Sequence, residues 1–284
     1  MLKQRILTAL VLLAILLPAT FYSNATPFGV VTLVLLTCAA WEWANLNGFE
    51  RMAALLTGLV CALLCAGAWY LGMPYVRLGN LWMLVGAFWV IAGAWALRSG
   101  VAAWQGFPRV LRLTGGVLLL WAAWLAVMQA RVIGVNFLLS VLVLVWAADI
   151  GAYFSGRAFG GRIFPNKLAP SISPGKTWEG VMGGMVAVFL VALLWMALES
   201  HVDRQSVSIY TRLWMMGTPL LSVGLVFLVA MSVVGDLVES LFKRAAGVKD
   251  SSKLLPGHGG VLDRVDALLP TLPLAMMLVS GGLQ

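Results

Sequence analysis

Charge is scarce in this chain: 11% of its 284 residues are charged, and only eleven are acidic. A soluble globular domain carries about 25% charged residues, so this composition excludes a water-soluble fold. Cysteine is also rare, since Cys38, Cys61 and Cys65 are the three in the chain, and all lie in apolar stretches without the spacing of a metal site. A disulfide framework is therefore excluded as the basis of the fold. Strict alternation of apolar and polar residues is missing too, which argues against barrel strands.

Apolar residues, by contrast, make up 61% of the chain and give it a mean hydropathy of +0.94. They occur in blocks of roughly 17 to 24 residues, long enough to cross a hydrocarbon core of about 30 Å as helices. With loose boundaries, the predicted spans are 6–22, 28–44, 53–71, 80–97, 110–128, 132–153, 180–198, 213–235 and 261–281. The sequence therefore predicts an all-α integral membrane protein, a polytopic bundle of about nine transmembrane helices. We expect one membrane domain over 1–284, in which 1–130 supplies weakly diagnostic helices and 131–284 carries the catalytic helices and cytosolic loops.

The distribution of basic residues predicts the orientation of these helices, because Lys and Arg accumulate in the cytoplasmic loops of membrane proteins. With nine spans, fifteen of the nineteen basic residues fall on the side of the N-terminus. The opposite side receives Arg77, Arg131, Arg204 and Arg212. We therefore expect the N-terminus in the cytosol and the C-terminus outside. The net charge of +8 then reflects topology and contact with anionic lipid, and nucleic acid is not an expected partner.

Two features of the apolar segments have more than one interpretation. The first block follows Lys3 and Arg5 and precedes Ser23, so it also resembles a secretory signal peptide that would be removed. The length of the block favours a retained span. Gly180 and Gly184 are four residues apart, which allows close helix packing either within the chain or in a homodimer.

The acidic residues are concentrated in one part of the chain. Under the predicted topology, seven of the eleven lie at cytosolic ends of the later spans or in the loop between the last two: Asp149, Glu179, Asp236, Glu239, Asp250, Asp263 and Asp266. A carboxylate at membrane depth costs roughly 2.5 to 3.5 kcal/mol, so such residues need a reason to be there. Asp236 and Glu239 are three residues apart, as are Asp263 and Asp266, which places each pair on one side of its helix. Oxygen ligands gathered in this way suit Mg²⁺, although the same acids are also able to pair with nearby basic side chains and hold helices in register.

Glycine and basic residues near these acids predict a phosphate site. The segment 256–260, Pro-Gly-His-Gly-Gly, leads into the last predicted span, where backbone amides at a helix N-terminus bind anions. In the earlier loop, Lys176 precedes a helix start that has Ser173 or Thr177 near its N-cap. That loop is not a P-loop, because Pro170 stands where the first glycine is required and no strand precedes it. An ordinary glycine-rich connector is the alternative interpretation of 256–260, and His258 alone is more typical of a loop residue than of a catalyst.

A long motif of mixed chemistry occupies the C-terminal part of the chain: Ser240, Lys243, Arg244, Lys249, Asp250, Leu255, Pro256, His258, Gly259, Gly260, Asp263, Arg264 and Asp266. These residues fill every fixed place of the motif of the phosphatidate cytidylyltransferases, also called CDP-diglyceride synthases, and the chain resembles that family. The stretches 149–156 and 173–180 are similar to the family as well, so the resemblance covers at least the C-terminal half. One departure is Gly175, where the family often carries a basic residue that would contact a phosphate.

The resemblance implies an enzyme of phospholipid biosynthesis in which the phosphate of phosphatidic acid attacks the α phosphorus of CTP, giving CDP-diacylglycerol and pyrophosphate. It also implies Mg²⁺ as cofactor, with Asp236 and Asp263 as main ligands, Glu239 beside them, and compatibility with a second cation in the same centre. The residues expected to bind substrate are Lys176, Arg264, Ser173, Gly259 and Gly260. The residues expected to act in catalysis or to support the metal centre are Lys249, Asp250, His258 and Asp266.

Two other classes are compatible with many spans and buried acids. A CTP-dependent lipid kinase of the polyprenol type would share the topology and phosphate loops but release CDP instead of pyrophosphate. A secondary transporter would place its ionisable residues near the midplane and show internal repeats, neither of which is evident. A structural scaffold leaves the acid cluster unexplained. For location, we expect a bacterial cytoplasmic (inner) membrane, with the active site facing the cytosol.

Overall fold

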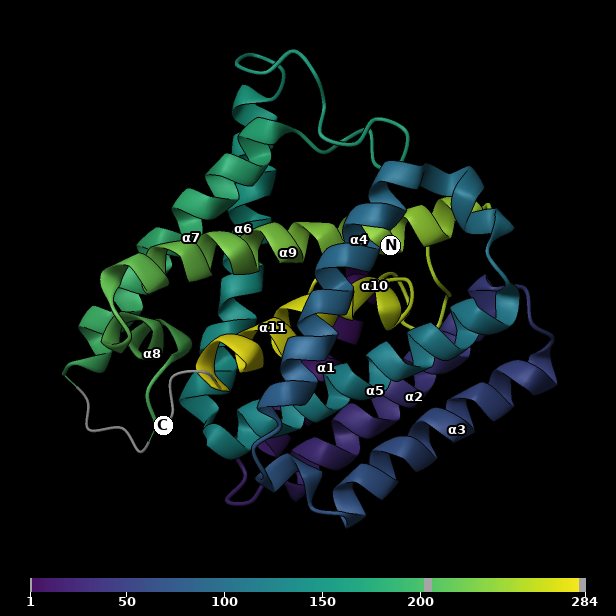
Figure 1. Cartoon of the computed structure of the whole chain (residues 1–284), viewed down its shortest axis with the longest axis horizontal. Helices are drawn as coiled ribbons and strands as arrows, with labels where there is room; N and C mark the ends of the chain where they lie inside the picture. Colours follow the sequence, from purple (N-terminus) through teal and green to yellow (C-terminus); the bar gives the residue numbers. More distant parts are fainter. Residues whose placement is uncertain (1, 202–205, 281–284) are drawn as a thin grey trace.

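The computed structural model describes residues 2–201 and 206–280, and within these ranges the chain is helical without a strand (Figure 1). Its elements are α1 (Leu2–Phe21), α2 (Thr26–Leu46), α3 (Arg51–Tyr70), a 3-10 turn (Met73–Tyr75), α4 (Gly79–Gly106), α5 (Arg109–Ile133), α6 (Val135–Phe159), α7 (Trp178–Glu199), α8 (Ile209–Met215), α9 (Thr218–Ala245), α10 (Leu262–Val265) and α11 (Leu268–Ser280). Eight helices in the described ranges, α1 to α7 and α9, are long and apolar enough to span a membrane. The predicted all-α fold is therefore confirmed, and its long apolar helices are consistent with a polytopic membrane bundle.

The helix α9 differs from the predicted eighth span in its bounds. It begins later than expected and continues to Ala245, ten residues beyond the predicted end at 235. Asp236 and Glu239 therefore lie within the helix and not at its end, which corrects the prediction. The helix can continue through these acids because each is paired with a lysine: Asp236 with Lys176, and Glu239 with Lys243 one turn further along the same helix.

The predicted ninth span forms two short helices, α10 and α11. At 1.5 Å per residue, the thirteen residues of α11 extend only about 20 Å, less than the hydrocarbon core of about 30 Å. Most of α11 is buried, and it packs against α4, α5 and α9 inside the bundle (Figure 1). No helix in the described part of 261–281 is long enough to span the membrane. The nine crossings and the outside position of the C-terminus therefore stay predictions.

Several helix ends meet at one end of the bundle. The Arg5 side chain of α1 donates to the carbonyl of Gly257, 2.9 Å away, and Gln105 of α4 donates to the carbonyl of Ala245 at the end of α9. The indole of Trp43, near the end of α2, donates to the carbonyl of Arg112 at the start of α5, at 3.1 Å. These are ends that the basic residues predict to share the cytosolic side. We call this the polar end of the bundle.

Helices α6 and α7 run side by side in close contact (Figure 1). A Cβ atom on Gly184 would lie 2.7 Å from the carbonyl oxygen of Ala148, and one on Gly180 would lie 3.0 Å from that of Ala152. Because real Cβ atoms are not found so close to a backbone oxygen, only glycine fits at Gly184. The spacing of Gly180 and Gly184 therefore serves an internal helix contact, the first of the two alternatives left open by the sequence.

Candidate active site

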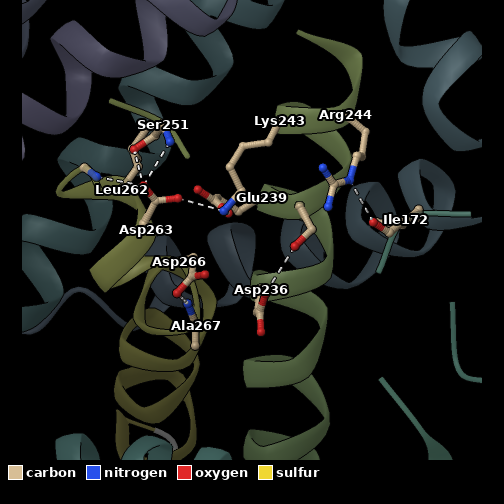
Figure 2. A network of polar contacts seen from close by, with 12 residues as sticks. Ile172, Asp236, Glu239, Lys243, Arg244, Ser251, Leu262, Asp263, Asp266 and Ala267 are labelled. Carbon is tan, nitrogen blue, oxygen red and sulfur yellow. Dashed lines mark hydrogen bonds and ion pairs between the residues drawn. The ribbon is translucent and has the colours of Figure 1, made fainter. Parts of the chain in front are cut away.

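Lys243 of α9 joins two carboxylates at the polar end of the bundle (Figure 2). Its Nζ lies 2.7 Å from Oδ1 of Asp263 and also forms an ion pair with Glu239, one helical turn earlier. All three side chains are nearly enclosed, with exposed fractions of 14% for Lys243, 6% for Glu239 and 5% for Asp263. Buried charges are tolerated when they are paired, as these three are. Because Asp263 belongs to α10, the ion pair with Lys243 also links α9 to α10.

The second oxygen of Asp263 organises the glycine-rich turn before α10. Oδ2 accepts hydrogen bonds from the amide of Gly260 at 2.7 Å and from both the amide and the hydroxyl of Ser251 at 2.9 Å. Burial opposes ionisation, but the bonds from Lys243, Gly260 and Ser251 outweigh it and hold the pKa of the Asp263 carboxyl at about 2. Gly259 has a φ of +83°, and a Cβ on it would lie 2.6 Å from Oδ2 of Asp263. The turn therefore requires glycine at position 259, while the substrate-binding roles of Gly259 and Gly260 stay predictions.

Asp236 lies on α9 one turn before Ser240 and faces the loop that precedes α7. Its Oδ2 is 2.5 Å from Nζ of Lys176, and its Oδ1 accepts from the Ser240 hydroxyl at 3.3 Å. Asp266 lies near enough to Asp236 for their charges to interact: burial first, and then the charge of Asp236, raise the pKa of the Asp266 carboxyl to about 7. Asp149 of α6 adds to the same negative field. Three acids from three elements therefore approach one another near Lys176.

A cavity of about 610 Å³ opens beside this group of acids, between α6, α7 and α9. We call it the transfer cavity. Arg157, Lys176, Asp149 and Asp236 give it a charged part, while Val181, Val229 and Val233 give it an apolar part. Its volume is within the range of about 300 to 1,000 Å³ that is typical of ligand pockets. It can thus hold a ligand with both a phosphate and an apolar portion.

The loop between α6 and α7 is held over this cavity by Glu179. The buried Oε1 of Glu179 accepts from the amides of Gly161, Ile163 and Phe164, each at 3.0 Å. Thr177 is the N-cap of α7 and accepts from the amide of Gly180 at 3.1 Å. Of the two N-cap residues considered from the sequence, the structure therefore selects Thr177.

Comparison with known proteins identifies the family of this chain. Residues 3–281 match the model described as the cytidylyltransferase family. The chain belongs to this family. A phosphatidate cytidylyltransferase of Pseudomonas aeruginosa is 41% identical over 99% of this chain and 98% of its own length, and one of Haemophilus influenzae is 36% identical over 96% of both. One of Brucella suis is 44% identical over 48% of this chain and 44% of its own length.

The carboxylates of this cytidylyltransferase family member were predicted to hold Mg²⁺. Among the described residues, no group of three or more His, Cys, Asp or Glu side chains is arranged to hold a metal ion, and Lys243 is paired with both Glu239 and Asp263. The donor chemistry nevertheless fits: Asp236 is 35% exposed beside the transfer cavity and interacts with Asp266. Oδ1 of Asp263 accepts one hydrogen bond and keeps a free lone pair. The ligand roles of Asp236, Asp263 and Glu239 stay predictions.

The other predicted site residues lie at the same end of the bundle, but their side chains form few hydrogen bonds or ion pairs. Lys249, Asp250 and Arg264 are exposed, and their side chains make no hydrogen bond or ion pair with another described residue. His258 is half-buried, and its buried Nδ1 has no partner within the described part of the chain. Ser173 is half-buried in the loop that carries Lys176, and its carbonyl accepts from the Lys176 amide at 3.2 Å.

Glu42 of α2 has a central position in the site that was not predicted from the sequence. This fully buried carboxylate accepts from the amide of Val261 at 2.9 Å, from that of Leu262 at 2.8 Å and from the hydroxyl of Ser252 at 2.6 Å. The hydroxyl of Ser251 lies 3.2 Å from Glu42 and 2.9 Å from Asp263, so its single proton is shared between them. An acid inside an apolar span was the signal that would have revealed it, because such a residue needs a partner.

Proposed function

We propose that this protein transfers the cytidylyl group of CTP to phosphatidic acid, giving CDP-diacylglycerol and pyrophosphate for phospholipid biosynthesis. Membership of the cytidylyltransferase family over residues 3–281 supports the reaction class. The near full-length similarity to two phosphatidate cytidylyltransferases supports the choice of lipid acceptor. The lipid kinase and transporter alternatives have no such support.

The transfer cavity is the observation that carries the proposal. Its charged part gathers Arg157, Lys176 and Asp236 at the polar end of the bundle, and its valines continue toward the apolar part of the helices. A phospholipid has the same division, with phosphate at one end and acyl chains at the other. The chains of phosphatidic acid would stay among apolar groups while its phosphate meets the phosphates of CTP near Lys176.

The reaction requires little covalent chemistry from the protein. An oxygen of the phosphatidic acid phosphate forms a new bond to the α phosphorus of CTP, and the bond from that phosphorus to the bridging oxygen breaks as pyrophosphate leaves. Lys176 and Arg157 supply positive charge that holds the reacting phosphates and offsets their mutual repulsion. Lys243, Glu42 and Asp263 hold the glycine-rich turn in place, and the amides of Gly260, Val261 and Leu262 are occupied by these two carboxylates. The turn would therefore act by fixing the position of the Asp263 carboxylate.

Mg²⁺ is part of the proposal. Asp236 and Asp263 would hold it, with Glu239 and Asp266 nearby, and a second cation in the same centre is compatible with the number of acids. When bound, the ion would neutralise phosphate charge and polarise the phosphorus toward attack. The observation that supports this role is that Asp236 is 35% exposed beside the transfer cavity and that Asp263 keeps a free lone pair on Oδ1.

We further propose that the polar end faces the cytosol of a bacterial inner membrane. The support is the excess of basic residues predicted for that side, together with the bacterial origin of the relatives. CTP would then reach the site from the cytosol. A homodimer also stays a proposal, and the Gly180–Gly184 pair does not support it because these glycines pack against α6.

The test is a transfer assay with purified protein in detergent, phosphatidic acid, Mg²⁺ and CTP labelled on the α phosphorus. We expect label to enter the lipid and unlabelled pyrophosphate to be released, with at least a hundredfold loss in Asp263→Asn and little change in Lys253→Gln, an exposed residue outside the network. Folding of each variant is checked by its thermal unfolding midpoint. Release of labelled CDP, with lipid phosphorylation but no label in the lipid, would instead identify a lipid kinase and overturn the proposal.

A further inference from the structure

A second cavity, of about 480 Å³, lies at the polar end on another part of α9 from the transfer cavity. Its walls come from the end of α2, the end of α4, the start of α5 and the end of α9, and Figure 1 shows these four helix ends converging. Trp43, Trp104 and Phe242 form an aromatic wall, with ring centroids 4.3 Å apart between Trp104 and Phe242. We call it the arginine cavity.

Two basic side chains, Arg109 and Arg112, line the arginine cavity within one turn of α5, and its lining contains no Asp or Glu. Neither arginine takes part in any of the three ion pairs found among the described residues. The Arg112 guanidinium lies 5.7 Å from the centre of the Trp104 ring, and its buried Nε has no hydrogen-bond partner in the described ranges. Arg109 is exposed and Arg112 keeps a buried donor without a partner, so the cavity favours an anion, and guanidinium groups suit phosphate oxygens.

The position of the arginine cavity points to the source of that phosphate. Arg109 is the first residue of a helix long and apolar enough to span the membrane, so it lies where such a helix meets the headgroup region. The next two side chains, Val110 and Leu111, are apolar and are 64% and 55% exposed. A soluble phosphate would gain nothing from this apolar surface, whereas a lipid can place its headgroup on the arginines and its chains along Val110 and Leu111.

We propose that the arginine cavity binds the phosphodiester headgroup of an anionic membrane phospholipid, as a second lipid site apart from the transfer cavity. This goes beyond the proposed reaction, which needs only the substrate lipid. Ser251 also lines the arginine cavity and hydrogen-bonds to Asp263. A bound headgroup would therefore lie beside the turn that holds the Asp263 carboxylate.

The test uses the full-length protein and phosphatidylglycerol, an anionic phosphodiester lipid, with neutral phosphatidylcholine as the comparison. Lipid retention is measured by native mass spectrometry after release from mixed detergent micelles, without CTP. We expect wild type to retain phosphatidylglycerol in preference to phosphatidylcholine, and the double variant Arg109→Gln/Arg112→Gln to bind it at least about tenfold more weakly. The matched control is Arg51→Gln/Arg98→Gln, which removes the same charge from two exposed residues outside the cavity and should retain the preference.

A second variant guards against misfolding of the double variant. Ala246 is exposed and lines the arginine cavity, so Ala246→Glu places a carboxylate beside both arginines without removing either, and it should weaken phosphatidylglycerol binding. Unchanged binding in both variants would overturn the proposal. Displacement of the lipid by millimolar inorganic phosphate or CTP would also overturn it, because the cavity would then be a soluble-phosphate site. Loss of cytidylyl transfer by folded Ala246→Glu in phosphatidylcholine micelles would show that the cavity belongs to the reaction site.

Discussion

Replacing Glu42 by Gln tests whether a buried carboxylate on α2 holds the turn that carries Asp263. In wild type each Glu42 oxygen accepts one backbone amide and one serine hydroxyl: Oε1 from Val261 and Ser252, Oε2 from Leu262 and Ser251. Glutamine keeps one oxygen and turns an NH₂ group toward one of these amides, which leaves a buried donor facing a donor. An unsatisfied buried amide costs about 1–3 kcal/mol and loss of charge assistance adds about 1 kcal/mol, so we expect destabilisation of about 2–4 kcal/mol.

The measurement is the thermal unfolding midpoint in detergent, which should fall by about 5–15 °C for this loss of stability. Glu50→Gln is the matched control, because Glu50 is an exposed acid shortly after the same helix and its replacement should leave the midpoint unchanged. We also expect Glu42→Gln to lower kcat for cytidylyl transfer at temperatures where it remains folded, since the Asp263 turn is displaced. A midpoint and kcat equal to those of wild type would refute the role assigned to Glu42.

Three further predictions concern the ion-pair network and the helix contact. Lys243→Met leaves buried carboxylates without their cation and should destabilise the protein by about 3–5 kcal/mol in chemical or thermal unfolding, partly restored by adding Asp263→Asn. The pKa of Asp263, about 2, is below its ordinary value of 3.8, so its contribution of about 2 kcal/mol is complete above pH 4 and is lost as the pH falls toward 2; the acid-unfolding curve of Asp263→Asn should lack this component. Gly184→Val places a Cβ against the Ala148 carbonyl and should cost at least about 1–3 kcal/mol, whereas Gly67→Ala, with open space around it, should be neutral or stabilising.

The spanning helices were predictable because their signal is local. A run of about twenty apolar residues has to lie in lipid or in a protein core whatever its neighbours are, and its helical form satisfies its own backbone. The predicted spans 28–44 and 180–198 accordingly match α2 (Thr26–Leu46) and α7 (Trp178–Glu199) within two residues at each end. The end of α9 was missed because the partner of Asp236, Lys176, comes from another segment, although Glu239 pairs with Lys243 on the same helix.

In the site, too, the sequence motif predicted which residues matter, but not which of them come into contact. The sequence predicted Asp236, Glu239 and Asp263 as metal ligands, with pairing to basic side chains as the alternative. The structure pairs all three with lysines, and their ligand roles stay predictions. The motif did not show that Lys243 joins two of them, which depends on how α10 packs against α9. The exposed positions of Lys249 and Arg264 were also not evident from their place in the motif.

The amino-acid sequence by itself determined the helical membrane fold, the concentration of acids at one end and the family, because hydrophobic length and a dense motif are properties of the chain in order. Tertiary structure decided which polar groups meet: Lys176 with Asp236, Lys243 with Asp263, and the Glu42 carboxylate with the amides at the start of α10. It also decided that α11 is a short buried helix and that two cavities lie along α9. Burial makes such contacts strong or costly, and burial is known only once distant segments have packed together.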